Sequence, residues 1–429
     1  MTSPIAVELI DALKPVVREC LDDAGRLSDL RYADLRLEVV EGKYASAENG
    51  TPKGSGDDYA FALGVRVLAG SRTVAPGYVG LTLGAVDAGE LPKLIREALE
   101  RAHRRAAVNA EMKANAREKF GALGEALADT RLHRVEVRED SVPAVYRVDP
   151  RAMQLNELIS YTTDVSRQVA AVAPALKYNA ITTLTQLSRE LFASTDGALI
   201  DQAFALTQGS CSVVAVAGGT SQDLHDALGH QRGWEILLGG VDEPLIRFPP
   251  FLEFALALAR EGVELAAASP LPSTEGEVIV VTDPHYNTLV SHEIVGHPVE
   301  LDRALKMETA YAGRSWLLGG LTEHQIGKRV ASPLVTAYSD PSLPGYGHYV
   351  YDHEGTPARR VVHIEEGVFR GFMNSRQTAA IFGGAPNGHW KATDASLVPL
   401  IRMSNTVFAA GARPAEDIIR EVDRGWYLA

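Results

Sequence analysis

One stretch of the chain constrains its fold and chemistry more than any other, Asp283-Pro-His-Tyr-Asn-Thr-Leu-Val-Ser-His-Glu-Ile-Val-Gly-His-Pro-Val-Glu300. It predicts a short helix that carries His292, Glu293 and His297 in the pattern His-Glu-x-x-x-His. Two neutral imidazoles suit a divalent zinc ion, and a carboxylate fixed beside them can take a proton from metal-bound water and pass it to a leaving amine. The stretch therefore predicts a zinc site mounted on a helix.

The spacing of the two histidines does not fit a regular helix. Five residues at about 100° each place them about 140° apart, so the helix must bulge or end between them if both bind one ion. Gly296 tolerates a non-helical backbone, and Pro298 disfavours helical dihedral angles at the preceding residue, His297. We therefore expect His292 and Glu293 on the last helical turn and His297 on the exit loop. A pair of ordinary histidines near a helix end is the alternative interpretation.

Composition limits the class of protein. The chain has 429 residues, enough for two domains, with 46% apolar and 23% charged residues, as in soluble globular proteins. Its net charge of -13 argues against nucleic acid or an anionic membrane as the main partner. Cys20 and Cys211 are too few for a disulfide framework, and the sequence predicts neither a signal peptide nor a membrane-spanning apolar run. We expect a cytoplasmic protein.

The periodicity of the chain predicts an α+β fold. Helical spacing is found at residues 5–27, 88–128 and 149–172, and strand-like alternation at 34–40, 59–68 and 73–83. Between the first two strands, Gly, Ser and Pro at 49–58 predict a mobile loop. Helices packed on strands predict an N-terminal α/β layer domain, which we assign to residues 1–240. Short strands beyond the motif predict a second, antiparallel β domain at 241–429.

The motif and several other segments resemble one protein family. His-Glu-Ile-Val-Gly-His at 292–297 resembles the signature of the TldD/PmbA family of metallopeptidases, in its TldD-like branch. Further segments agree in order along nearly the whole chain: Asp34-Leu-Arg-Leu, Gly64-Val-Arg-Val, Asp352-His-Glu-Gly-Thr-Pro357, Gly367-Val-Phe-Arg-Gly-Phe-Met373 and Pro399-Leu-Ile-Arg-Met-Ser-Asn-Thr406.

This resemblance implies more than the residues alone. It implies an N-terminal α/β domain, a C-terminal twisted β-barrel-like domain, zinc bound by His292 and His297, and Glu293 as general base. It also implies a homodimer, or a heterodimer with a family relative, that cleaves unfolded peptides inside an enclosed cavity. Arg402 and Asn405 are candidates for lining that cavity, and hydrogen bonds that fix a loop are the alternative role for both.

The chain departs from the family pattern in two places. Where relatives often continue Gly-His-Gly-Leu-Glu-Gly-Asp, this chain has Gly296-His-Pro-Val-Glu-Leu-Asp302, which we expect to narrow or re-aim the loop after the second ligand. The family's third ligand is a cysteine in a segment beyond the last residue given, and no cysteine follows Cys211. The chain is therefore truncated, takes its third ligand from another residue, or no longer binds catalytic zinc.

Other residues could replace that cysteine. The downstream histidines are more simply explained as surface or loop residues, because none has ligand spacing: His324, His348, His353, His363 and His389. Glu300 and Glu308 are further possibilities, since glutamate completes some sites with two histidines.

Two functions from different classes follow. The first is a zinc-dependent peptidase acting on unfolded peptides or peptide precursors, with Glu293 as general base. The alternative is a non-catalytic subunit that binds peptide or completes a dimer without a full zinc site. The intact trio of His292, Glu293 and His297 favours the enzyme, since a scaffold has no need of it.

Overall fold

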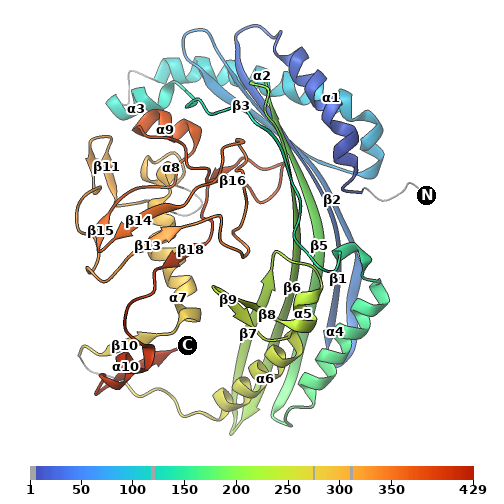
Figure 1. Ribbon diagram of the computed structural model, residues 1–429, viewed down its shortest axis with the longest axis vertical. Helices are drawn as coiled ribbons and strands as arrows, with labels where there is room; N and C mark the ends of the chain where they lie inside the picture. The colour runs from blue at the N-terminus through green and yellow to red at the C-terminus, as the bar shows by residue number, and fades with distance from the viewer. Residues whose placement is uncertain (1–5, 117–120, 274–275, 310–312) are drawn as a thin grey trace.

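The computed structural model describes residues 6–116, 121–273, 276–309 and 313–429. It combines helices with a long, curled sheet, and residues 276–309 and 313–429, here called the C-terminal segment, lie on the concave side of that sheet (Figure 1). The predicted helices 5–27 and 88–128 include positions outside the described residues, namely 5 and 117–120. No helix within the described ranges has the length and apolar character needed to cross a bilayer.

The large sheet has the strand order β3-β2-β1-β5-β6, and both β4 and β7 pair with β6. All its pairings are antiparallel except β4 with β6. Its strands are β1 (Leu30–Glu48), β2 (Thr51–Ala69), β3 (Ala75–Leu83), β4 (Glu139–Val142), β5 (Leu176–Ser194), β6 (Leu199–Ala217) and β7 (Thr220–His230). Four central strands are therefore far longer than the alternating segments recognised in the sequence.

The loop predicted at 49–58 is wrong. Strands β1 and β2 form a continuous hairpin that turns at Asn49 and Gly50, whose φ angles are 47° and 75°. These left-handed angles are typical of an Asn-Gly hairpin turn. The Gly, Ser and Pro residues after it remain in the strand because each pairs with a residue of β1.

Helices cover the convex face of the sheet (Figure 1). Their bounds are α1 (Leu9–Ala24), α2 (Leu91–Ala116), α3 (Gly121–Ala128), α4 (Leu155–Ala170), α5 (Glu235–Gly239) and α6 (Phe251–Ala267). Alternation along β1 explains this layer, because Leu35, Leu37 and Val39 face a core shared with α1 and α2. A second core lies under α4 and α6.

The other side of the same strands is polar but buried. Asp34, Arg36 and Arg66 are at most 5% exposed because the C-terminal segment packs over them. Arg66 pairs with Asp34 and with Glu354 of that segment. Arg36 Nη1 lies 2.8 Å from Nδ1 of His353. Charged side chains thus join the sheet to the C-terminal segment.

The C-terminal segment consists of short strands and helices. A four-stranded sheet has the order β15-β14-β13-β18, and smaller pairs surround it. The bounds are β8 (Val241–Glu243), β9 (Ile246–Phe248), β10 (Ile279–Thr282), β11 (Leu318–Gly320), β12 (Glu323–His324), β13 (Ala337–Ser339), β14 (Val361–Glu365), β15 (Val368–Phe369), β16 (Trp390–Lys391), β17 (Leu400–Ile401), β18 (Thr406–Phe408) and β19 (Gly425–Leu428), with β8 and β9 preceding the segment. Helices α7 (Pro284–Ser291), α8 (Leu301–Ala304), α9 (Arg376–Phe382) and α10 (Ala415–Arg420) complete it.

Candidate metal centre

The motif helix has a firm start. Strand β10 pairs in parallel with β19 and leads directly into α7. Asp283 caps α7, because its Oδ1 accepts a 2.6 Å hydrogen bond from the backbone N–H of Tyr286, and Pro284 occupies the first turn. The strand, the cap and the predicted helix therefore form a rigid mount for the residues that follow.

The helix does not end between the two histidines but widens into a π-helical turn. Residues His292–Gly296 form a π-helical turn in which the N–H of His297 donates to the C=O of His292, and a 3-10 turn follows at His297–Val299. A π turn accommodates one extra residue, so it brings side chains five apart to one face. The expected bulge is confirmed.

The expected position of His297 on an exit loop is wrong. Its φ and ψ are -63° and -44°, and those of Gly296 are -57° and -58°, so both are helical. The restriction imposed by Pro298 is overcome by the turns on either side. Gly296 instead leaves room for the side chain of Met403, whose Sδ would lie 1.9 Å from a Cβ at position 296.

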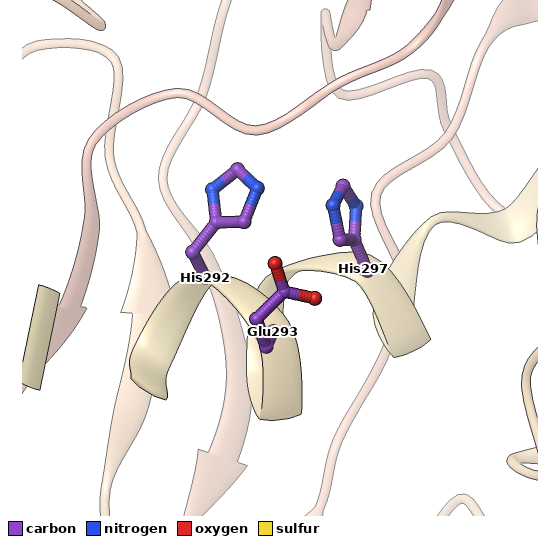
Figure 2. A group of neighbouring side chains, drawn as sticks. All are labelled: His292, Glu293 and His297. Atoms are coloured by element: carbon purple, nitrogen blue, oxygen red, sulfur yellow. The ribbon is translucent and has the colours of Figure 1, made fainter. Parts of the chain in front are cut away.

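The three motif side chains converge. Ligand atoms from His292, Glu293 and His297 all lie within 4.8 Å of one another, and the two imidazole ring centres are 4.4 Å apart. Figure 2 shows both rings on the same side of the turn, with the carboxylate of Glu293 between them. His292 and Glu293 are exposed and His297 is half-buried. Two imidazoles and one carboxylate are donors that zinc prefers, so these residues fit the ion.

A buried ionic cluster lies behind His297. Both carboxylate oxygens of Glu300 are 3.4 Å from Nδ1 of His297, and the same carboxylate pairs with Arg303 and with Arg402 at 3.3 Å. Burial, with Arg303 and His292 nearby, lowers the pKa of His297 to about 4. Burial also raises the pKa of Glu300 to about 7, against the opposing effect of the two arginines.

The other candidate ligands lie elsewhere. Within the described ranges, the motif trio is the group of His, Cys, Asp and Glu side chains placed to hold an ion. His353 contacts Glu190 on β5, His363 bonds Ser339, and His389 lies against Asn387. His348 is near the carbonyl of Pro341, and His324 packs against Phe382. Neither these histidines nor Glu308 joins the trio.

Arg402 and Asn405 take different places. Arg402 contacts Glu300 and so borders the metal centre from a segment far along the chain. Asn405 fixes a loop: its Nδ2 donates to the carbonyl of Leu343 at 2.7 Å, and its Oδ1 accepts from the N–H of Gly347 at 3.1 Å. The residue types around Glu300 suggested only a possible metal ligand. Glu300 is three residues from both His297 and Arg303, and this helical spacing could have indicated its contacts with them.

The fold and the donor set define a class of proteins that carry a His-Glu-His group on an interrupted helix. Two family models match the chain, one described as PmbA/TldA metallopeptidase domain 1 at residues 33–106 and one as the PmbA/TldA metallopeptidase C-terminal domain at residues 275–429. The chain belongs to the TldD/PmbA family of metallopeptidases, as its motifs predicted.

Individual relatives agree with this assignment. A protein of Methanothermobacter thermautotrophicus named metalloprotease is 30% identical over 280 residues, which cover 65% of this chain and 56% of the relative. A zinc metalloprotease TldD homolog of Saccharolobus solfataricus is 24% identical over 63% of this chain and 56% of its own length. The chain therefore spans little more than half of these relatives. The crystal structure of TldE from Thermococcus kodakarensis shares the fold, with a TM-score of 0.67 at 18% identity over 98% of this chain and 81% of that one.

Proposed function

We propose that this protein is a zinc-dependent peptidase that hydrolyses unfolded peptides or peptide precursors. The convergence of His292, Glu293 and His297 within 4.8 Å on one side of the π turn carries the proposal. Membership in a metallopeptidase family supports it, as do relatives named metalloprotease and zinc metalloprotease.

Each motif residue has a separate role in this proposal. His292 and His297 hold the zinc ion. When bound, zinc polarises the scissile carbonyl and lowers the pKa of water toward about 7. Glu293 takes the proton from the attacking water and delivers it to the leaving amine, and its exposed position between the two rings leaves room for both transfers.

A peptide would find backbone partners at strand β18. This strand contacts α7, and Phe408 packs in the same cluster as Val295 of the π turn. The N–H of Asp340 donates to the C=O of Asn405, and the N–H of Ala409 donates to the C=O of Thr336. In this register the backbone N–H and C=O groups of Asn405, Val407 and Ala409 point toward β13. Thr406 and Phe408 therefore direct their N–H and C=O groups away from β13.

Among the described strands, β13 is the one that pairs with β18, so the other edge of β18 has no strand partner there. Pairing an extended peptide there would recognise backbone rather than sequence, which suits unfolded substrates. Peptides N-methylated at alternate residues test this mode. Methylation of the peptide N–H groups that would bond to β18 should raise KM, whereas methylation of the N–H groups between them should not. Equal effects in both series would exclude edge pairing.

We further propose that the protein acts as a homodimer or as a heterodimer with a family relative. The shared fold with a protein named TldE supports a relative as partner. Arg402, which borders the centre, and Asn405 are proposed to line the substrate cavity. Sedimentation of the chain alone and mixed with a relative measures the assembly.

Metal analysis tests the centre. Purified protein should contain about one zinc per chain, and a variant with both His292→Ala and His297→Ala should contain none. His225→Ala is the matched control, because His225 lies on β7, is bonded to Ser212 and belongs to no such group in the described residues. Zinc retained in full by the double variant would place the site elsewhere.

Glu293→Gln separates the base from the ligands. Loss of a positioned acid or base typically lowers the rate by about 10²–10⁴, while zinc content should stay unchanged. Full activity would refute the role as base, and loss of zinc would make Glu293 a ligand. If the wild-type protein and the Glu293→Gln variant both bind peptide and neither cleaves it, the protein is the non-catalytic subunit instead.

A further inference from the structure

Glu300 is held in a fixed position behind His297. Its side chain is buried, with 0% of the residue exposed. Its backbone bridges to Met373, whose N–H bonds the C=O of Val299 at 2.9 Å, while the N–H of Leu301 bonds the C=O of Met373 at 3.1 Å. The carboxylate therefore starts from a backbone fastened on both sides, and its direction toward His297 does not depend on a mobile loop.

The carboxylate lies between one imidazole and two guanidinium groups. Both oxygens are 3.4 Å from Nδ1 of His297, Arg303 pairs with Oε2, and Nη1 of Arg402 is 3.3 Å from Oε2. Two guanidinium partners favour the charged carboxylate, since charge-assisted bonds are stronger than neutral ones. Arg303 is itself close to the ring, with Nη2 3.2 Å from the same Nδ1.

These contacts bear on the two tautomers of His297. If Nδ1 carries the proton, it donates to Glu300 and leaves the lone pair of Nε2 available to a metal. If Nε2 carries the proton, Nδ1 accepts from Arg303 and no lone pair is left on Nε2. A guanidinium cannot accept a hydrogen bond, so only Glu300 supports the first tautomer. The ring thus has one partner for each state, at 3.4 Å and 3.2 Å.

We propose that Glu300 is a positioning residue that keeps His297 in the tautomer protonated on Nδ1 and thereby ready to bind metal through Nε2. The inference rests on the proposed function for the identity of the metal, but its first consequence is visible without metal. Histidines that bind metals commonly donate their other N–H to a carboxylate, and loss of that partner typically weakens metal binding about 10–100-fold.

Asp302 provides a matched control. It is also a buried carboxylate of the same turn, 6% exposed, but it accepts from the backbone N–H groups of Arg303 at 2.8 Å and Ile401 at 2.9 Å. The variants Glu300→Gln and Asp302→Asn each remove one negative charge at nearly constant size. Only Glu300→Gln changes a group that faces His297. An effect seen in Glu300→Gln and not in Asp302→Asn therefore comes from the position of Glu300 and not from lost charge or altered folding.

Nitrogen NMR of metal-free protein labelled on histidine is the first measurement. At pH 8, above the pKa of about 7 for Glu300 and of about 4 for His297, the wild type and Asp302→Asn should show the proton of His297 on Nδ1. Glu300→Gln should move it to Nε2, because Arg303 and Arg402 take the single remaining oxygen of the side chain. The amide NH2, like Arg303, can then only donate to Nδ1. A wild-type ring protonated on Nε2 would overturn the proposal even if the Glu300 variant failed to fold, and so would an unchanged tautomer in that variant.

Zinc affinity, measured by competition with a chromophoric chelator, is the second measurement. It should fall about 10–100-fold in Glu300→Gln and less than about threefold in Asp302→Asn. Equal affinity losses would overturn positioning by Glu300 while leaving zinc binding by His292 and His297 intact. If the wild type binds no zinc yet its tautomer follows Glu300, the proposed peptidase fails and the positioning role stands.

Discussion

Replacing Glu38 with glutamine should make the protein more stable at alkaline pH. Glu38 on β1 lies directly opposite Glu190 on β5, and both are covered by the C-terminal segment. Glu190 has two stabilising neighbours: Nε2 of His353 lies at 3.1 Å, and the cationic Nζ of Lys391 lies at 3.9 Å. Burial opposes its ionisation, but Lys391, His353 and Arg36 together hold its pKa below the usual range.

Lys391 also favours the charged form of Glu38, but less than burial and the charge of Glu190 oppose it. Oε2 of Glu38 accepts one hydrogen bond, from the N–H of Ala395 at 2.8 Å. Burial and then the charge of Glu190 raise its pKa from 4.5 to about 7. A raised pKa means that the folded state binds this proton more tightly than the unfolded state does. Its contribution to stability is therefore complete below about pH 4.5 and is lost as the pH rises through about 7.

The size of the loss follows from the shift. At 1.36 kcal/mol per pKa unit, Glu38 should lower the free energy of unfolding by about 3 kcal/mol at pH 8 relative to pH 4. Glutamine has no proton to lose and can still accept from Ala395, so Glu38→Gln should recover most of that stability. Reversible urea unfolding of the wild type and the variant at pH 5 and pH 8 measures the difference.

The opposite result is expected at Glu190, which is the control. Because its pKa is lowered, its charge stabilises the fold above the unfolded pKa, and Glu190→Gln should destabilise the protein at pH 8. If Glu38→Gln is no more stable than the wild type at pH 8, or gains equally at pH 5, then Glu38 is ionised in the folded protein and the reasoning fails.

Three further changes test the packing of the centre and the sheet. Gly296→Ala should cost about 1–3 kcal/mol and weaken zinc binding, because the new methyl group displaces the side chain of Met403. Gly320→Ala, with open space around its Cβ, should have neither effect; thermal melting and chelator competition measure both. Arg66→Met should cost about 3–5 kcal/mol in urea unfolding by leaving two buried carboxylates unpaired, and lowering the pH should restore part of it. Gln202→Ala should cost about 1–3 kcal/mol and speed hydrogen exchange at its backbone partner Tyr351.

The alternation of β1 predicted one face of the sheet correctly and left the other open. The period of two shows that Leu35 and Leu37 share a face with the helices, and the structure confirms this core. The same period places Asp34 and Arg36 opposite, where a polar face would ordinarily meet water. Asp34 pairs with Arg66 of the neighbouring strand, and Arg36 contacts His353, which is 317 positions away. Local periodicity carries no information about such pairs.

The motif was predictable as a group of residues but not as a backbone. Its residue types and their order alone indicate a metal site, and the need for a bulge follows from helical geometry. The form of the bulge could not be predicted, because the backbone preferences of glycine and proline do not determine which hydrogen bonds form. Here a π turn and a 3-10 turn follow one another and keep His297 helical. The role of Arg402 beside Glu300 depends on a contact across 102 positions, which spacing could not reveal.

The charged interface between the sheet and the C-terminal segment restricts how such chains can recombine. A hydrophobic interface tolerates substitutions on either side, provided that the total side-chain volume is kept. Here the salt bridges of Arg66, the bond from Arg36 to His353 and the contact of Glu190 with Lys391 each need a specific partner across the boundary. A chimaera that takes its sheet from one relative and its C-terminal segment from another would bury unmatched charges unless both members of each pair were inherited together. Substitutions at these positions should therefore be tolerated only as compensated pairs.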